Sequence, residues 1–151
     1  MKLIPLTQGL FAQIDDCDYT QLSKFNWYAH KHKKTYYAER KEKGKTILMH
    51  RVIMKTPENL EVDHIDHNGL NCQKYNMRNC TFIQNRRNQT AFGKSVFLGV
   101  YYSNKHIRAA ISINKKRTYL GTFTCEEDAA KAYDVKAKEL FGEFANLNFK
   151  D

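Results

Sequence analysis

Acidic, imidazole and amide side chains gather in the stretch "LEVDHIDHNGLN", residues 60–71. Apolar and polar positions alternate up to Val62, which predicts a short strand that ends at Asp63 and His64. Gly69 and the neighbouring Asn residues predict a loop directly after this strand. Two Asp and two His in so short a stretch fit either a solvated polar loop or a metal-assisted hydrolytic centre.

The residues that follow predict a second strand and a helix. The sequence "MRNCTF" favours a short strand. Thr81 has Gln84 three residues later, which is the spacing of a capping box, so a helix is expected to start near Phe82. A strand–strand–helix hairpin of this size would bring the helical residue Asn85 close to the end of the first strand.

Phosphodiester hydrolysis needs a divalent metal ion, a base that activates water, and a group that orients the base. Carboxylate and amide oxygens suit Mg²⁺ or Mn²⁺, and a neutral imidazole suits the base. Asp63, His64 and Asn85 offer these groups, and the expected hairpin would bring them together. A metal-dependent hydrolytic centre is therefore the functional hypothesis for this part of the chain.

"VDHIDHNGLN" and "YNMRNCTFIQNRRN" resemble the HNH nuclease motif, in the variety with Asn at the third position that is found in phage and intron-encoded homing endonucleases. Together with "IPLTQGLFAQIDDCDYTQLSKFNWYA", "YYAER" and "ILMHRVIM", the resemblance covers nearly all of residues 3–88. It implies that His64 is the general base, that Asp63 and Asn85 are metal ligands, and that Asn76 steadies the loop that carries His64.

Two departures from the family pattern are visible. Met77 stands where Leu is usual, a change of similar volume. The Cys-x-x-Cys pairs of some HNH nucleases are missing, so no structural zinc is expected. The four cysteines are expected to be free thiols in or near the cores: Cys17, Cys72, Cys80 and Cys125.

Other polar residues near the motif keep two interpretations. Asp66 and His67 are expected on the surface rather than as ligands, and Asn88 has a possible helper role beside Asn85. His50 with Arg51 is expected to be a hydrogen-bonded histidine beside a core strand, with a phosphate contact as the alternative. Three arginines are expected to contact phosphates near the centre, or else to be solvated charge: Arg78, Arg86 and Arg87. Three further histidines are expected to face solvent or DNA backbone: His30, His32 and His106.

The C-terminal third predicts a three-stranded antiparallel sheet followed by a helix. The strands are "VFLGVYY", "RAAISIN" and "RTYLGTF", and the helix is "TCEEDAAKAYDVKAKELFG", with Thr124 as N-cap and Gly142 as stop. Side chains alternate between the two faces of a strand, so Ile111 and the residues that share its face are expected to point toward the helix. Arg108 and Arg117 then face outward, where a sheet can enter the major groove.

This segment, about residues 97–149, resembles the Apetala/ethylene-response-factor (ERF) DNA-binding domain through "LGVYYS", "IRAAISI", "RTYLGTF", "EEDAAKAYDVKAKELFG" and "ANLNF". The resemblance implies a set of DNA-contacting positions on the outward sheet face: Tyr101, Ser103, Arg108, Ala110, Ser112, Arg117 and Tyr119. Tyr101, Ala110 and Ser112 replace charged residues of plant members, and Tyr119 replaces Trp. The plant target sequence is therefore not carried over, and discrimination between DNA bases is expected to be weaker.

The 25 Lys and Arg against 16 Asp and Glu give a net charge of +9, which favours an anionic partner: nucleic acid, an anionic membrane surface or an acidic protein. With neither a long apolar run nor a signal peptide, no membrane contact is expected, and the protein is expected in the cytoplasm of a bacterial or phage-infected cell. The predicted fold is α+β: a ββα-metal nuclease domain at 1–88, a linker at 89–95, and a three-stranded antiparallel sheet on one helix at 96–151.

The sequence therefore predicts a metal-dependent endonuclease that acts on double-stranded DNA as a monomer or homodimer, with no small-molecule cofactor. The alternatives are a non-catalytic DNA-binding regulator with a nuclease-like fold, and a protein that binds or cleaves RNA. Target sequence, and nicking versus cutting of both strands, stay open.

Overall fold

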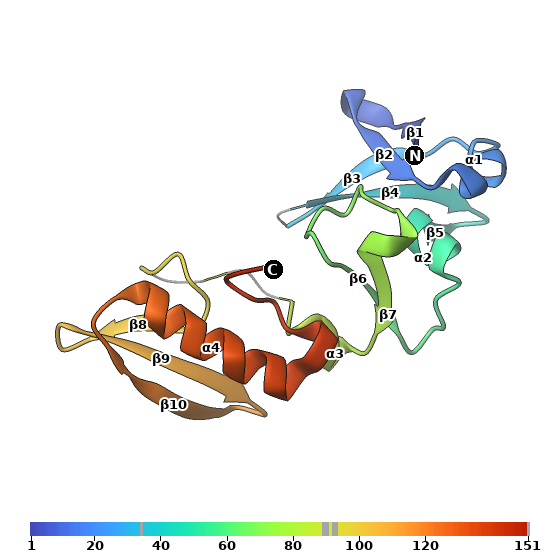
Figure 1. Ribbon diagram of the computed structural model, residues 1–151. Coiled ribbons are helices and arrows are strands. Elements are labelled where there is room, and N and C mark those ends of the chain that lie inside the picture. Colours follow the sequence, from blue (N-terminus) through green and yellow to red (C-terminus); the bar gives the residue numbers. More distant parts are fainter. Residues whose placement is uncertain (34, 89–90, 92–93, 151) are drawn as a thin grey trace. The chain divides into compact units, whose positions relative to one another are not determined.

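The computed structural model describes residues 1–33, 35–88, 91 and 94–150. It is an α+β structure with several small antiparallel sheets, and it divides into two compact units, Met1–Asn85 and Arg86–Asp151 (Figure 1). Residues 89, 90, 92 and 93 of the expected linker lie outside the described residues. None of the helices in the described ranges is long and apolar enough to cross a membrane.

The first unit begins with a two-stranded hairpin and a short helix. Strands β1 (Lys2–Pro5) and β2 (Phe11–Ile14) pair antiparallel, and helix α1 (Asp16–Leu22) follows. Asp15 is the N-cap of this helix, three residues before Asp18, the acid that the sequence suggested as the cap.

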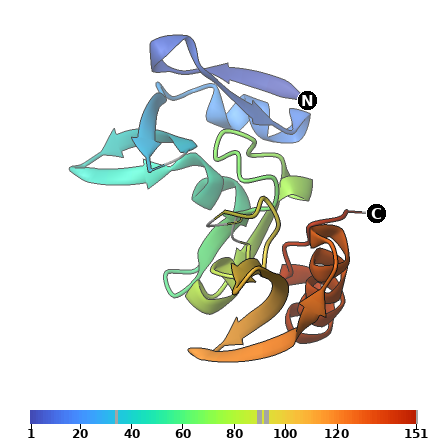
Figure 2. The same ribbon diagram turned by 90° about the vertical axis from the view of Figure 1, so that its left-hand side faces the viewer.

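A three-stranded antiparallel sheet comes next, in the order β3-β4-β5 (Figure 2). Its strands are β3 (Tyr28–His32), β4 (Thr35–Glu42) and β5 (Lys45–Leu48). The apolar run after residue 45 does not stay extended, because helix α2 (Met49–Met54) begins directly after β5. His50 therefore lies on a helix beside the sheet and not on a strand.

Residues 61–85 form a two-stranded ribbon followed by a short helix. Strand β6 (Glu61–His64) pairs antiparallel with β7 (Met77–Cys80), and α3 (Phe82–Asn85) follows. The capping box is confirmed: the Thr81 N–H donates to Gln84 Oε1 at 2.8 Å, and the Gln84 N–H donates to Thr81 Oγ1 at 3.3 Å.

The loop between β6 and β7 is anchored to the N-terminal hairpin. The Gln13 N–H donates to the Leu70 carbonyl, and the Cys72 N–H donates to the Gln13 carbonyl, each at 2.8 Å. Leu70 and Cys72 are buried in a core shared with β1, β2, α1 and α2. Hydrophobic burial of these positions thus fixes the loop that follows His64.

The second unit is a three-stranded antiparallel sheet with one helix on one face (Figures 1 and 2). Its elements are β8 (Val100–Ser103), β9 (His106–Ile113), β10 (Lys116–Phe123) and α4 (Glu126–Phe141). Two-residue turns join the strands, and all four turn residues have positive φ, as type I′ hairpins require: Asn104, Lys105, Asn114 and Lys115.

The core of the second unit lies between this sheet and α4. Val100 and Ala109 from the sheet pack with Ala129 and Ala130 from the helix. Gly99 has φ +74°, and a Cβ there would overlap the Tyr133 ring, so the close approach requires glycine. The expected N-cap was wrong by one residue: Cys125 occupies the position assigned to Thr124, whereas Gly142 ends the helix as expected.

Candidate functional site

The ribbon register decides which side chains of the HNH-like stretch share a face. Asp63 lies opposite Arg78, and His64 lies opposite Met77. Because neighbouring residues on a strand point to opposite faces, Asp63 and His64 project on the two sides of the ribbon. A substrate that touches both must therefore approach at the end of β6, where the strand gives way to the loop.

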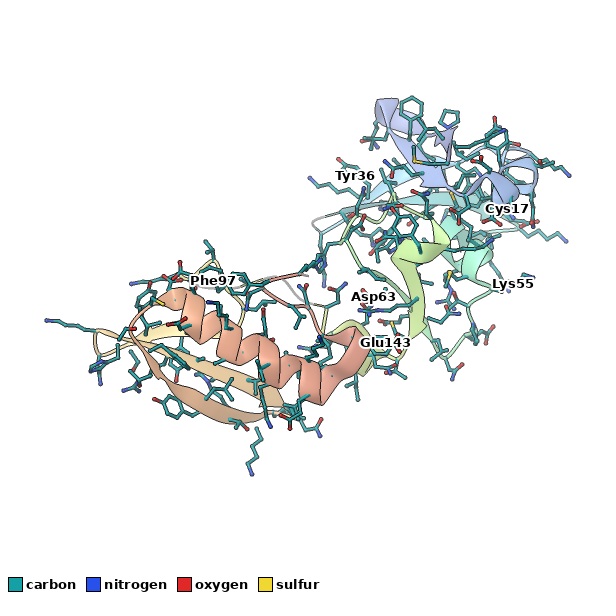
Figure 3. All side chains as sticks on the ribbon, viewed as in Figure 1. Cys17, Tyr36, Lys55, Asp63, Phe97 and Glu143 are labelled. Carbon is teal, nitrogen blue, oxygen red and sulfur yellow. The ribbon has the colours of Figure 1, made fainter. Side chains whose placement is uncertain are left out.

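Asp63 is held by an ion pair across the ribbon. Its Oδ2 accepts hydrogen bonds from Arg78 Nε at 2.8 Å and from Arg78 Nη2 at 2.7 Å. Asp63 is only 4% exposed; Figure 3 labels it on β6. A carboxylate this deeply buried needs a charged partner, which Arg78 supplies in the structure.

Asn85 reaches back from α3 to the same strand. Its Nδ2 donates to Glu61 Oε2 at 2.7 Å. Glu61 and Asp63 are two residues apart on β6 and so share one face. Sequence reasoning missed Glu61, although its place two residues before Asp63 was a signal for a second carboxylate on that face.

His64 lies in a cluster of aromatic rings on the other side. The His64 ring centroid is 5.2 Å from that of His50 and 5.7 Å from that of Tyr37, and the centroids of Tyr37 and His50 are 5.0 Å apart. These rings come from three elements, β6, α2 and β4. The cluster buries His64 to 6% exposure.

Burial also sets the charge of these imidazoles. It lowers the pKa of His64 to about 4, against the opposing effect of Asp66 and Asp63, whose negative charges raise it. It lowers the pKa of His50 to about 3, with smaller contributions from His64 and Arg51. Both rings are therefore neutral at pH 7, and a neutral ring can accept a proton.

The predicted hydrogen bond of His50 is not seen at its Nδ1, which is buried and has no partner among the described residues. Arg51, next to it, donates to the carbonyl oxygens of Leu60 at 2.8 Å and Pro57 at 2.7 Å. These hydrogen bonds connect Arg51 to the segment that leads into β6.

Asn76 connects the two ends of the loop after His64. Its Oδ1 accepts from the Asp66 N–H at 3.0 Å, and its Nδ2 donates to Asp66 Oδ1 and to the Asn71 carbonyl, both at 2.9 Å. Its backbone carbonyl accepts from the Ile65 N–H at 2.8 Å. Asn76 thus holds the loop after His64 through hydrogen bonds to Ile65, Asp66 and Asn71.

The three arginines expected at phosphates have different surroundings. Arg78 pairs with Asp63 as described above. Arg87 belongs to the second unit, where its guanidinium lies 4.3 Å from the Phe141 ring centroid and donates to the Ser112 carbonyl at 3.1 Å. Arg86 is the first residue of that unit. For all three, contact with phosphate stays a prediction.

The outward face of the second unit gathers the residues expected to contact DNA. Strand register places Tyr101 opposite Arg108, Ser112 opposite Arg117, and Ala110 opposite Tyr119, and Ser103 follows the same parity on β8. This is the face away from α4, whose contacts involve Val100 and Ala109.

Two contacts organise that face. The Arg117 guanidinium stacks 3.9 Å from the Tyr101 ring centroid. The hydroxyls of Tyr119 and Thr122 are 2.5 Å apart. Ser112, Arg117 and Tyr119 are exposed, whereas Ala110 is buried between its larger neighbours. The outward face therefore presents the Arg117 cation stacked on the Tyr101 ring, with the small residues Ala110 and Ser112 on the same face.

Comparison with known proteins gives a match that covers most of the chain. The chain is similar over 147 residues to an uncharacterized HNH endonuclease of Acanthamoeba polyphaga mimivirus, at 33% identity, and the match covers 93% of this chain and 76% of that protein. No family model and no solved structure matches the chain.

Plant transcription factors match shorter stretches. An ethylene-responsive transcription factor-like protein of Arabidopsis thaliana is 53% identical over 39 residues, 26% of this chain and 17% of that protein. An AP2-like ethylene-responsive transcription factor of the same plant is 38% identical over 82 residues, 50% of this chain and 14% of that protein. These are partial similarities to transcription factors, whereas the viral match spans most of both chains. The chain belongs to the family of HNH endonucleases.

Proposed function

We propose that the protein is a metal-dependent HNH endonuclease that hydrolyses phosphodiester bonds in double-stranded DNA. The observation that carries this proposal is the end of β6, where a buried acid and a neutral buried imidazole adjoin a loop fixed by Asn76. The proposed nuclease domain is residues 1–88, which extends three residues beyond the first compact unit, and β6, β7 and α3 are its proposed ββα-metal element.

The residues on one side of the ribbon fit a hard divalent cation. Asp63 and Glu61 supply carboxylate oxygens, and the bond from Asn85 Nδ2 to Glu61 leaves the amide oxygen of Asn85 as its ligand atom. Asp63 and Asn85 are the proposed ligands, and oxygen donors of this kind suit Mg²⁺ or Mn²⁺. A cation bound there would neutralise charge on the phosphate and on the departing 3′ oxygen.

His64 is the proposed general base. Its neutral imidazole takes a proton from water as the water oxygen bonds to phosphorus; the bond to the 3′ oxygen breaks, and that oxygen is protonated by solvent. Asn76 acts as a positioning residue, because its bonds to Asp66 and Asn71 hold the loop that begins at His64.

The second unit is proposed to bind duplex DNA. The exposed cation of Arg117, stacked on Tyr101, and the guanidinium of Arg108 can neutralise phosphates when the strands lie in the major groove. Phosphate contacts of this kind make binding fall steeply as salt rises. One chain carries one centre, so a monomer would nick one strand, and cutting both strands would need a homodimer or two successive events.

The rival function is a non-catalytic DNA-binding protein on a nuclease-like fold. A plasmid-nicking assay separates the two: supercoiled DNA is incubated with the protein in Mg²⁺, in Mn²⁺, and in excess chelator. The proposal expects relaxed circles with either metal and none with chelator. Tight DNA binding without nicking in any metal would favour the rival, and nicking that persists in chelator would overturn the metal dependence. Matched RNA tests the remaining alternative.

A further inference from the structure

The β3–β4 hairpin of the first unit gathers two imidazoles and an acid on one face. His30 and His32 are two residues apart on β3 and so point the same way. Glu39 on β4 lies opposite Tyr28, which shares that parity. None of these three residues belongs to the proposed nuclease centre.

The three side chains converge closely. His30 Nδ1 is 3.0 Å from Glu39 Oε2, and His32 Nε2 is 3.0 Å from Glu39 Oε1. All three ligand atoms lie within 4.8 Å of one another. Glu39 is only 3% exposed, so a buried carboxylate is aimed at two imidazoles. The expectation that His30 and His32 face only solvent or DNA backbone left out this shared partner.

We propose that His30, His32 and Glu39 form a binding site for a first-row transition ion, with Zn²⁺ as the preferred occupant. Two imidazole nitrogens and one carboxylate oxygen are a donor set that Zn²⁺ takes, with ligand distances of about 2.0–2.2 Å. Two ligand atoms 3.0 Å apart can both reach an ion at that distance. The imidazoles are 57% and 49% exposed, so their rings have room to rotate and close the remaining gap.

The surroundings leave space for an ion and a further ligand. The three residues line a shallow open pocket of about 590 Å³, together with Tyr28, Thr46 and Leu48. Lys41 lines it as well, but its ammonium donates to Thr46 Oγ1 at 2.6 Å. Three protein ligands with an open side leave a coordination position for water.

This site differs in chemistry from the proposed nuclease centre. Nitrogen-rich donors favour Zn²⁺ over Mg²⁺, whereas Asp63 and Asn85 offer oxygen alone. The expectation of no structural zinc rested on the missing cysteine pairs and did not consider histidines on a hairpin. A chain without nuclease activity would still bind zinc here, so this inference does not depend on the proposed function.

The test is zinc titration of the full-length protein in the presence of excess Mg²⁺, which occupies oxygen-donor sites. Calorimetry with ZnCl₂ gives stoichiometry and affinity, and CoCl₂ gives a visible absorption spectrum that reports the ligand environment. Proteins compared are the wild type, His30→Ala, His32→Ala, the double variant, and the matched control His106→Ala, which removes an exposed strand histidine from the other unit. Because His30 and His32 are half-exposed, their removal should leave the fold intact.

We expect one zinc per chain in the wild type and in His106→Ala. Each single variant should bind at least about tenfold more weakly, since even the outer partners of metal ligands are worth 10–100-fold in affinity. The Co²⁺ spectrum should change in both. If the double variant binds zinc as tightly as the wild type, or if the wild type binds none, the three residues form only a hydrogen-bonded His–Glu–His cluster and the inference is overturned.

Discussion

Acid should destabilise the first unit before most of the carboxylates are protonated. His50 and His64 are buried against each other, and their folded-state pKa values are about 3 and about 4. In the unfolded chain both return to about 6.5. Between pH 6.5 and about 4, the unfolded state therefore binds more protons than the folded state, so stability is complete above pH 6.5 and is lost as the pH falls.

The size of this effect follows from the linkage relation, in which each extra proton bound by the unfolded state contributes about 1.4 kcal/mol per pH unit. Two histidines, not quite fully protonated in the unfolded chain at pH 6, give a loss of about 2–3 kcal/mol from pH 6 to pH 5. That is a large share of the roughly 5–15 kcal/mol that stabilises a typical domain. His50→Gln or His64→Gln removes one site and should roughly halve the slope.

The assay is urea unfolding at pH 6 and pH 5 in chelator, followed by fluorescence. Trp27 is the single tryptophan and is buried in the first unit, so its emission reports that unit alone. The control is His106→Gln, which changes an exposed histidine of the second unit and should leave the slope as in the wild type. A wild-type loss below about 1 kcal/mol per pH unit, or a slope that neither buried variant changes, would show that these two histidines do not control the acid sensitivity of the first unit.

Three further substitutions probe other parts of the structure. Gly69→Ala would place a Cβ against the Tyr37 ring and within 2.5 Å of a backbone carbonyl oxygen. The free energy of unfolding, measured by Trp fluorescence in urea, should therefore fall by about 1–3 kcal/mol or more. An unchanged urea midpoint would contradict this packing. Asn76→Ala removes the bonds to Asp66 and should cost about 1–3 kcal/mol in the same assay, with slower nicking; full activity would contradict its positioning role. Arg117→Ala should weaken DNA binding and lower the salt slope by about 0.9, measured by fluorescence anisotropy, and an unchanged slope would remove it from the phosphate contacts.

The sequence predicted local structure well where the signal is local. The capping box of Thr81 and Gln84 marked the start of α3, because its two hydrogen bonds join residues three apart. In the second unit, the alternation of side chains along β9 predicted that Arg108 and Ile111 lie on opposite faces, as the register shows.

Contacts between distant elements could not be predicted in the same way. The aromatic cluster around His64 needs α2 and β4 to pack beside β6, and no spacing in the sequence reveals that packing. The Asp63–Arg78 pair depends on the register of β6 with β7, and a slip of one residue would have separated the two charges. The His30–His32–Glu39 cluster likewise appears only once β3 and β4 are paired.

The role of His64 as general base can be measured by plasmid nicking and DNA binding on the same preparations. His64→Ala is compared with the wild type and with His67→Asn, which changes an exposed histidine of the same loop. If His64 is the general base, the Mg²⁺-dependent nicking rate should fall about 10²–10⁴-fold in His64→Ala, with DNA affinity retained and His67→Asn active. Full nicking by His64→Ala, or loss of DNA binding together with activity, would contradict it.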